Sequence, residues 1–86
     1  MKDADASPLA EVLHEADALR QAVVDRDLAE ARHRARMIET LAAIYDLDAV
    51  RSAAHRLEVD LGGRSSEQQL KSALETLSLA LDQALE

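Results

Sequence analysis

The sequence predicts an all-α protein, an antiparallel up-down-up-down four-helix bundle, and three observations support this. Gly occurs twice and Pro once among 86 residues, too few for the many turns of a β-sheet architecture. Ala, Leu, Glu, Arg, Asp and Gln dominate, a composition typical of helical proteins. Apolar residues recur at gaps of three and four in four successive segments, and the short joints between these segments favour antiparallel neighbours.

The first predicted helix begins at Ser7-Pro8 and runs to about Val24. Ser7 can cap it, and Pro8 fits the first turn, where no backbone N–H is needed. Its apolar stripe consists of Leu9, Val12, Leu13, Ala16, Leu19 and Val23. Residues 1–6 are small and polar, so we expect a disordered tail followed by a single domain over residues 7–86.

The second predicted helix begins after Asp27, whose spacing to Glu30 resembles a capping box. Its stripe consists of Leu28, Ala31, Ala35, Ile38, Ala42 and Tyr45. The third helix is expected to follow a cap at Asp46 or Asp48 and to end at Gly62-Gly63, because Gly tolerates the left-handed conformation. Its stripe consists of Leu47, Val50, Ala54, Leu57 and Leu61.

The fourth predicted helix follows a capping box formed by Ser65 with Gln68 or by Ser66 with Gln69. Its stripe consists of Leu70, Leu74, Leu77, Leu81 and the Ala84-Leu85 pair. Large apolar residues from all four stripes should meet in one core. We expect the core to contain Leu13, Leu19, Ile38, Leu57, Leu74, Leu77 and Leu81.

The composition argues against several classes of function. The chain lacks Cys, Phe and Trp and has one Tyr, so disulfides, thiolate metal sites and base-stacking platforms are not expected. Its net charge of −7 disfavours nucleic acid and anionic membranes as partners. No apolar run is long enough for membrane insertion, and the expected location is cytoplasmic. No phosphate-binding loop, Ser-His-Asp set or cofactor motif is present, so a conventional enzyme is not expected.

An internal repeat relates the second and third predicted helices. The pattern from Asp27 to Glu39 matches that from Asp46 to Glu58, at an offset of 19 residues. Two amphipathic helices of one bundle can share such a pattern without being a structural repeat. The repeat nevertheless places Arg36 and His55 at the same helical position.

The only basic run of this acidic chain is Arg32, His33, Arg34 and Arg36. One interpretation is a solvated helix face with ion pairs such as Glu30–Arg34. The other is a patch that binds an acidic partner. The three His residues have no i, i+4 spacing to one another or to a plausible carboxylate triad, so a metal site has little support from the sequence.

The segment from Asp27 to Thr40 resembles the phosphohistidine helix of histidine phosphotransfer (HPt) domains, which commonly reads Asp-x-x-x-Ala-x-x-x-Ala-His-x-Leu-Lys-Gly. Ile38 keeps the apolar position, but Arg36 takes the His position, Glu39 the Lys position and Thr40 the Gly position. The family's following helix ends in Leu-Glu, as Leu57-Glu58 does here, and the outer two helices match the rest of the family's bundle.

The resemblance implies an HPt-like signalling module of a two-component phosphorelay, whose partner is a response-regulator receiver domain or a sensor histidine kinase. Arg stays protonated and cannot accept a phosphoryl group, and Glu39 repels phosphate. This alignment therefore implies binding without phosphate acceptance. The implied binding surface comprises Arg32, His33, Arg36, Met37, Glu39, Thr40, Ala43 and Ile44.

Two alternatives remain open. Ala54-His55-Arg56-Leu57-Glu58-Val59 also resembles the family signature, and His55 would then be the phosphoacceptor of an active phosphotransfer domain. In this alignment Glu58 takes the Lys position, Val59 takes the Gly position and only one helix follows. The alternative interpretation of His55 is an ordinary solvated side chain beside the bundle seam. The third reading is a small helical chaperone or a structural subunit that forms a homodimer through a leftover apolar stripe.

Overall fold

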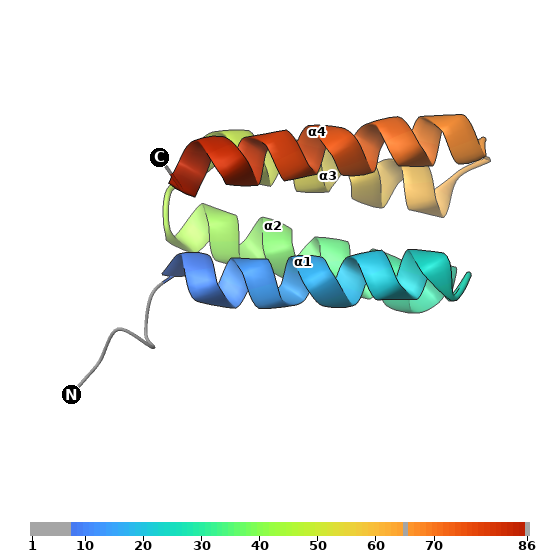
Figure 1. The fold of residues 1–86 in the computed structure, drawn as a ribbon, viewed down its shortest axis with the longest axis horizontal. Coiled ribbons are helices and arrows are strands. Elements are labelled where there is room, and N and C mark those ends of the chain that lie inside the picture. Colours follow the sequence, from blue (N-terminus) through green and yellow to red (C-terminus); the bar gives the residue numbers. More distant parts are fainter. Residues whose placement is uncertain (1–7, 65, 86) are drawn as a thin grey trace.

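The chain forms four helices in the computed structural model, which describes residues 8–64 and 66–85 (Figure 1). They are α1 (Pro8–Val24), α2 (Leu28–Ile44), α3 (Asp48–Gly62) and α4 (Glu67–Leu85). Successive helices run antiparallel, and the described residues contain no strand. The predicted four-helix bundle is confirmed. The predicted tail over residues 1–6 and the cap at Ser7 lie outside the described residues.

Side-chain caps fix the start of two helices as predicted. The Asp27 carboxylate accepts a hydrogen bond from the backbone N–H of Glu30, at 3.2 Å. Before α4, the N–H of Gln69 donates to Ser66 Oγ at 3.1 Å, and the N–H of Ser66 donates to Gln69 Oε1 at 2.9 Å. This reciprocal pair is a capping box, and it satisfies N–H groups that have no partner within the helix.

The expected cap of α3 is wrong. The N-cap residue is Leu47, and no side chain caps this helix. Asp46 instead closes α2: it adopts a left-handed φ of 62°, which lets the N–H of Leu47 reach the carbonyl of Ala42 at 2.8 Å. Asp48 is already the first residue of α3. Asp46 therefore closes the turn through its backbone conformation and Asp48 lies within α3, so neither carboxylate caps the start of α3.

The left-handed glycine expected after α3 is also wrong. The helix does end at Gly62, but Gly63 has a φ of −113°, which other residues adopt freely. The left-handed positions lie in the other two turns, at Arg26 and Asp46. In both turns an N–H three residues past the end of the helix bonds back to its last full turn, as Asp27 does to the Ala22 carbonyl at 2.9 Å.

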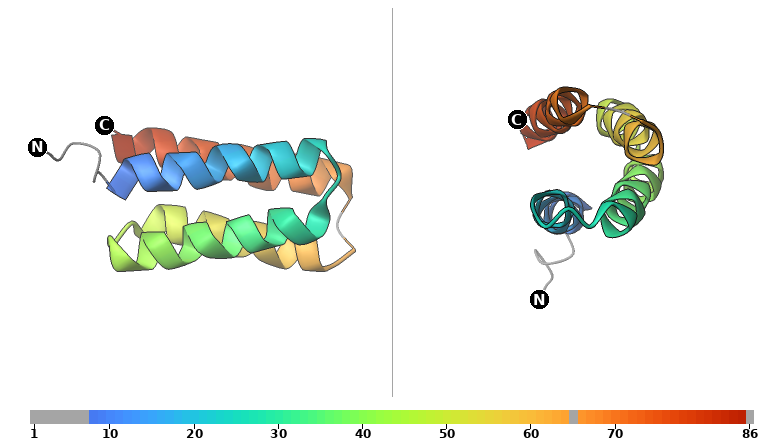
Figure 2. Two further views of the ribbon diagram at one scale, coloured as in Figure 1. Left: turned by 90° about the horizontal axis from the view of Figure 1, so that it is seen from below. Right: turned by 90° about the vertical axis from the view of Figure 1, so that its right-hand side faces the viewer.

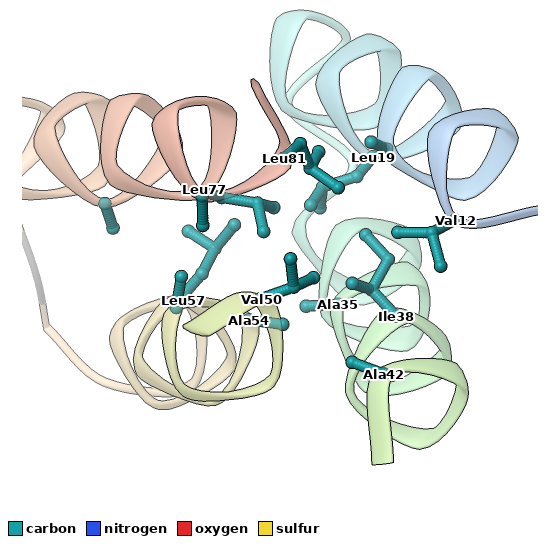
Figure 3. Packing of buried hydrophobic residues seen from close by; sticks show 14 of the residues in the cluster. Val12, Leu19, Ala35, Ile38, Ala42, Val50, Ala54, Leu57, Leu77 and Leu81 are labelled. Carbon is teal, nitrogen blue, oxygen red and sulfur yellow. The ribbon is translucent and has the colours of Figure 1, made fainter. Parts of the chain in front are cut away.

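The core is a single cluster drawn from all four helices. Of the predicted core residues, Leu19, Ile38, Leu57, Leu77 and Leu81 are buried, whereas Leu13 and Leu74 are partly buried at its edge. Leu77 points toward Leu57, and Leu81 toward Leu19 (Figure 3). Alanines supply much of the buried surface of α2 and α3, and small side chains let these two helices lie close together.

The bundle is an open arc when seen end on (Figure 2). Each helix packs along the next one in the chain, whereas α1 and α4 contact each other only slightly. A hydrogen bond from Arg20 Nη2 to Ser78 Oγ, 2.7 Å long, ties these outer helices together. Within the described residues, none of the helices combines the length and the apolar character needed to cross a lipid bilayer.

Candidate functional site

Chemistry-bearing side chains gather on the outer side of the seam between α2 and α3. No polar or charged side chain among the described residues is buried, so any site of this bundle lies at its surface. Arg36 on α2 donates from Nε and Nη2 to Glu58 Oε2 on α3, at 3.1 and 3.0 Å. His55 Nδ1 on α3 lies 3.3 Å from Glu39 Oε2 on α2. Two basic groups and two carboxylates thus form crosswise pairs between the helices.

The internal repeat explains this arrangement. Arg36 and Glu39 occupy the same positions in α2 as His55 and Glu58 occupy in α3. Ile38 and Leu57, which also match, are both fully buried and hold the two helices on a common core. When two such helices pack antiparallel, the basic group of each lies opposite the carboxylate of the other.

Glu58 is the most enclosed of the four groups. Its side chain is 15% exposed, against 62% for Arg36. Hydrogen bonds from Arg36 hold the pKa of Glu58 below its ordinary value, although partial burial acts in the opposite direction. The positive charges of Arg36 and Arg32 lower this pKa further.

Arg32 approaches the same part of α3. Its guanidinium lies over Gly62, where an added Cβ would come within 3.0 Å of Arg32 Cζ. The absence of a side chain at Gly62 therefore makes room for the arginine. Arg32 and Arg36 together place two positive charges near Glu58.

The remaining residues of the predicted binding surface do not all face one way. His33, Thr40, Ala43 and Ile44 are exposed, and Ile44 is exposed over 66% of its surface. Met37 instead lines a shallow groove against α1, which also contains Glu11 and His14. The predicted surface is thus divided between the α2–α3 seam, the outer face of α2 and the α1–α2 groove.

The basic run is largely neutralised by acidic side chains. Arg34 Nη1 lies 2.9 Å from Glu15 Oε1 on α1, and Arg34 Nε lies 2.8 Å from Glu30 Oε2 on its own helix. Arg36 is paired with Glu58. The Glu30–Arg34 pair is therefore present, as the solvated-face interpretation requires. Acidic side chains of both neighbouring helices, α1 and α3, therefore pair with arginines of α2.

Two features were missed in the sequence. Ligand atoms of Glu39, His55 and Glu58 all lie within 4.8 Å of one another. The sequence signal was the i, i+3 spacing of His55 and Glu58, which places both on one helix face, but the third member comes from another helix. A cleft between α1 and α4 was also missed; its lining includes Val23, Val24, Leu28, Leu70 and Leu74.

Comparisons with known proteins give no relative for this chain. A scan against protein-family models, a search of curated proteins and a search of solved structures each found no match.

Proposed function

We propose that this protein is an HPt-like signalling module of a two-component phosphorelay, which binds a receiver domain or a sensor histidine kinase without itself accepting phosphate. One observation carries the proposal. Arg36, the residue in the place that the HPt resemblance gives to the phosphoaccepting His, lies midway along α2 with its side chain 62% exposed. This is an accessible place for a partner to reach.

The local charges support binding rather than phosphate transfer. A guanidinium stays protonated and has no nucleophilic nitrogen. Glu39, in the place of the family's Lys, faces His55 and adds a negative charge where a cation would steady a phosphate. Glu58 adds a second carboxylate to the same region. Both features oppose a phosphoryl group on α2.

The guanidinium of Arg36 suits an acidic partner surface. Receiver domains cluster carboxylates around their phosphoaccepting Asp, and an HPt domain inserts its His there. A guanidinium in that position can pair with two carboxylate oxygens at once. Ala43 and Ile44 are exposed about two turns further along α2 and supply apolar surface there. Glu58 competes for the guanidinium, because it already accepts both of the hydrogen bonds described above.

Binding to receiver domains of the source organism tests the proposal. Arg36→Glu is expected to weaken binding by about 1–3 kcal/mol, or roughly 5- to 150-fold in Kd, because it places like charges together. Lys71→Glu on α4 is the matched control, since Lys71 lines the α1–α4 cleft instead. Arg20→Glu is a poorer control, because Arg20 ties α1 to α4 through Ser78.

A second substitution sharpens this experiment. Glu58→Gln removes the carboxylate that competes for Arg36 and is expected to tighten receiver binding. If Arg36→Glu and Lys71→Glu bind a cognate receiver equally well, Arg36 is an ordinary solvated residue and the docking proposal fails. A loss confined to Lys71→Glu would place the partner at the α1–α4 cleft.

A second candidate function is phosphate acceptance by His55. Its ring is 62% exposed, and the contact of Nδ1 with Glu39 leaves Nε2 as the ring nitrogen available to a phosphoryl donor. Incubation with a phosphorylated receiver or an autophosphorylated kinase distinguishes the two functions. We expect little or no acid-labile phosphate on the chain. Labelling that disappears in His55→Ala but persists in His33→Ala would establish phosphotransfer and overturn the first proposal.

A further inference from the structure

The three groups that meet on the α2–α3 seam form a typical ligand set for a transition-metal ion. We propose that Glu39, His55 and Glu58 bind a divalent transition-metal ion, with Zn²⁺ the best match, and that Arg36 weakens this binding. The site overlaps the proposed docking surface at Glu39 and Arg36, but metal binding does not depend on receiver docking.

The spacing of the ligand atoms fits a small tetrahedral ion. Zn²⁺ binds imidazole nitrogen and carboxylate oxygen at about 2.0–2.2 Å, so two ligands of one tetrahedral ion lie about 3.3–3.5 Å apart. His55 Nδ1 and Glu39 Oε2 are already 3.3 Å apart. All three ligand atoms lie within 4.8 Å of one another, so the distances to Glu58 must shorten by at most about 1.5 Å to reach the required spacing.

The chemistry of the donors selects the class of ion. An imidazole nitrogen with two carboxylates suits Zn²⁺ and its neighbours in the first transition row, whereas Mg²⁺ and Ca²⁺ prefer oxygen ligands only. Three protein ligands leave a fourth position open to water or an external ligand. His55 and Glu58 share one face of α3, and Glu39 faces them from α2. Two packed helices therefore hold the ligands.

Arg36 sets the affinity of this site. Both of its hydrogen bonds go to the same oxygen, Glu58 Oε2, so Oε1 lies outside the pair. With Arg32 nearby as well, two guanidinium groups balance two carboxylates, and the neighbourhood has no net charge to attract a cation. Removing Arg36 leaves a net negative charge, which favours a divalent ion.

The internal repeat suggests a second substitution at Arg36 that should increase metal affinity further. Arg36 faces Glu58 across the seam in the same way as His55 faces Glu39. Arg36→His therefore removes the competing charge and supplies a second imidazole beside Glu58. The variant is expected to hold two nitrogen and two oxygen ligands around one ion.

The test is a Zn²⁺ titration of the purified full chain, free of any affinity tag, by competition with a chromophoric chelator at neutral pH. We expect one ion per chain, about tenfold tighter binding in Arg36→Ala and tighter binding still in Arg36→His. His55→Ala and Glu39→Gln should abolish binding. His14→Ala and His33→Ala are the matched controls and should leave it unchanged.

Thermal unfolding with and without Zn²⁺ supplies a second measurement, because an ion that binds only the folded state raises Tm. Far-UV circular dichroism of each variant identifies any that fail to fold. The proposal is overturned if Arg36→Ala shows no saturable binding or binds no more tightly than the wild type. It is also overturned if binding survives His55→Ala, or is lost with His14 or His33.

Discussion

Two leucines of α4, two positions apart, give the sharpest test of the fold. Leu77 is 2% exposed and points toward Leu57 of α3, whereas Leu79 is 62% exposed on the outer side of the same helix. The substitution Leu→Ala removes the same atoms in both cases. Any difference in stability therefore measures burial and not composition.

The structure sets the size of the effect. Leu→Ala at a buried position costs about 2–5 kcal/mol, and less where the surroundings can close around the cavity. Since α4 packs closely on α3 but little on α1, it can shift inward, and we expect about 2–3 kcal/mol for Leu77→Ala. Leu57, fully buried on a helix with close neighbours on both sides, should cost more. Leu79→Ala should change stability by less than about 0.5 kcal/mol.

Urea denaturation followed by far-UV circular dichroism measures these differences. A chain of 86 residues has a total stability of about 4–13 kcal/mol, so Leu77→Ala and Leu79→Ala should still unfold cooperatively. A loss of about 2–3 kcal/mol corresponds to a fall in Tm of about 8–24 °C. The reasoning is refuted if Leu79→Ala destabilises as much as Leu77→Ala, or if Leu57→Ala costs less than Leu77→Ala.

Two further predictions concern the α2–α3 turn and the seam. Asp46→Gly should stabilise the protein by about 0.5–1 kcal/mol, because Gly accepts the φ of 62° without strain. The control Ala43→Gly, in the last turn of α2, should destabilise the protein by a similar amount, because Gly is unfavourable within a helix. Equal shifts of the urea midpoint in the two variants would contradict this prediction. Because the pKa of Glu58 is lowered in the folded state, its ionised form adds stability that is lost as the pH falls below its ordinary value. The stability difference between wild type and Glu58→Gln should therefore shrink toward acid pH in a series of urea midpoints, and a difference that stays constant would refute it.

The fold could be predicted because its main signals are local. Gaps of three and four place apolar side chains on one helix face whatever the helix packs against, so Leu19, Ile38 and Leu57 are buried as expected. Leu74 follows the same pattern but lies at the α1–α4 cleft, where the arc of helices stays open. Its partial burial depends on how far the outer helices close, and the sequence of one helix carries no signal for that.

The candidate site could be predicted only in part, because its contacts join different helices. The sequence identified Arg36 and His55 as equivalent positions but could not identify their partners. The alignment of α2 against α3 depends on how their turn closes, which requires the left-handed Asp46. The sequence likewise left open whether the basic run is a solvated face or a patch for a partner. The ion pairs of Arg34 with Glu15 of α1 and of Arg36 with Glu58 of α3 join different helices, so the sequence carried no signal for them.

The crosswise pairs also limit what single substitutions can show. Arg36 influences Glu58, Glu58 lies near Glu39, and Glu39 contacts His55, so a change at one position alters the charge at all of them. Receiver docking, phosphate acceptance and metal binding would each respond to Arg36 or His55. A double-mutant cycle over Arg36 and Glu58 isolates their pairwise term. If Arg36 docks into a receiver, the interaction between Arg36 and Glu58 should weaken receiver binding, because Glu58 already holds the Arg36 guanidinium. If the pair is only a solvated ion pair, its interaction energy should have no effect on receiver binding.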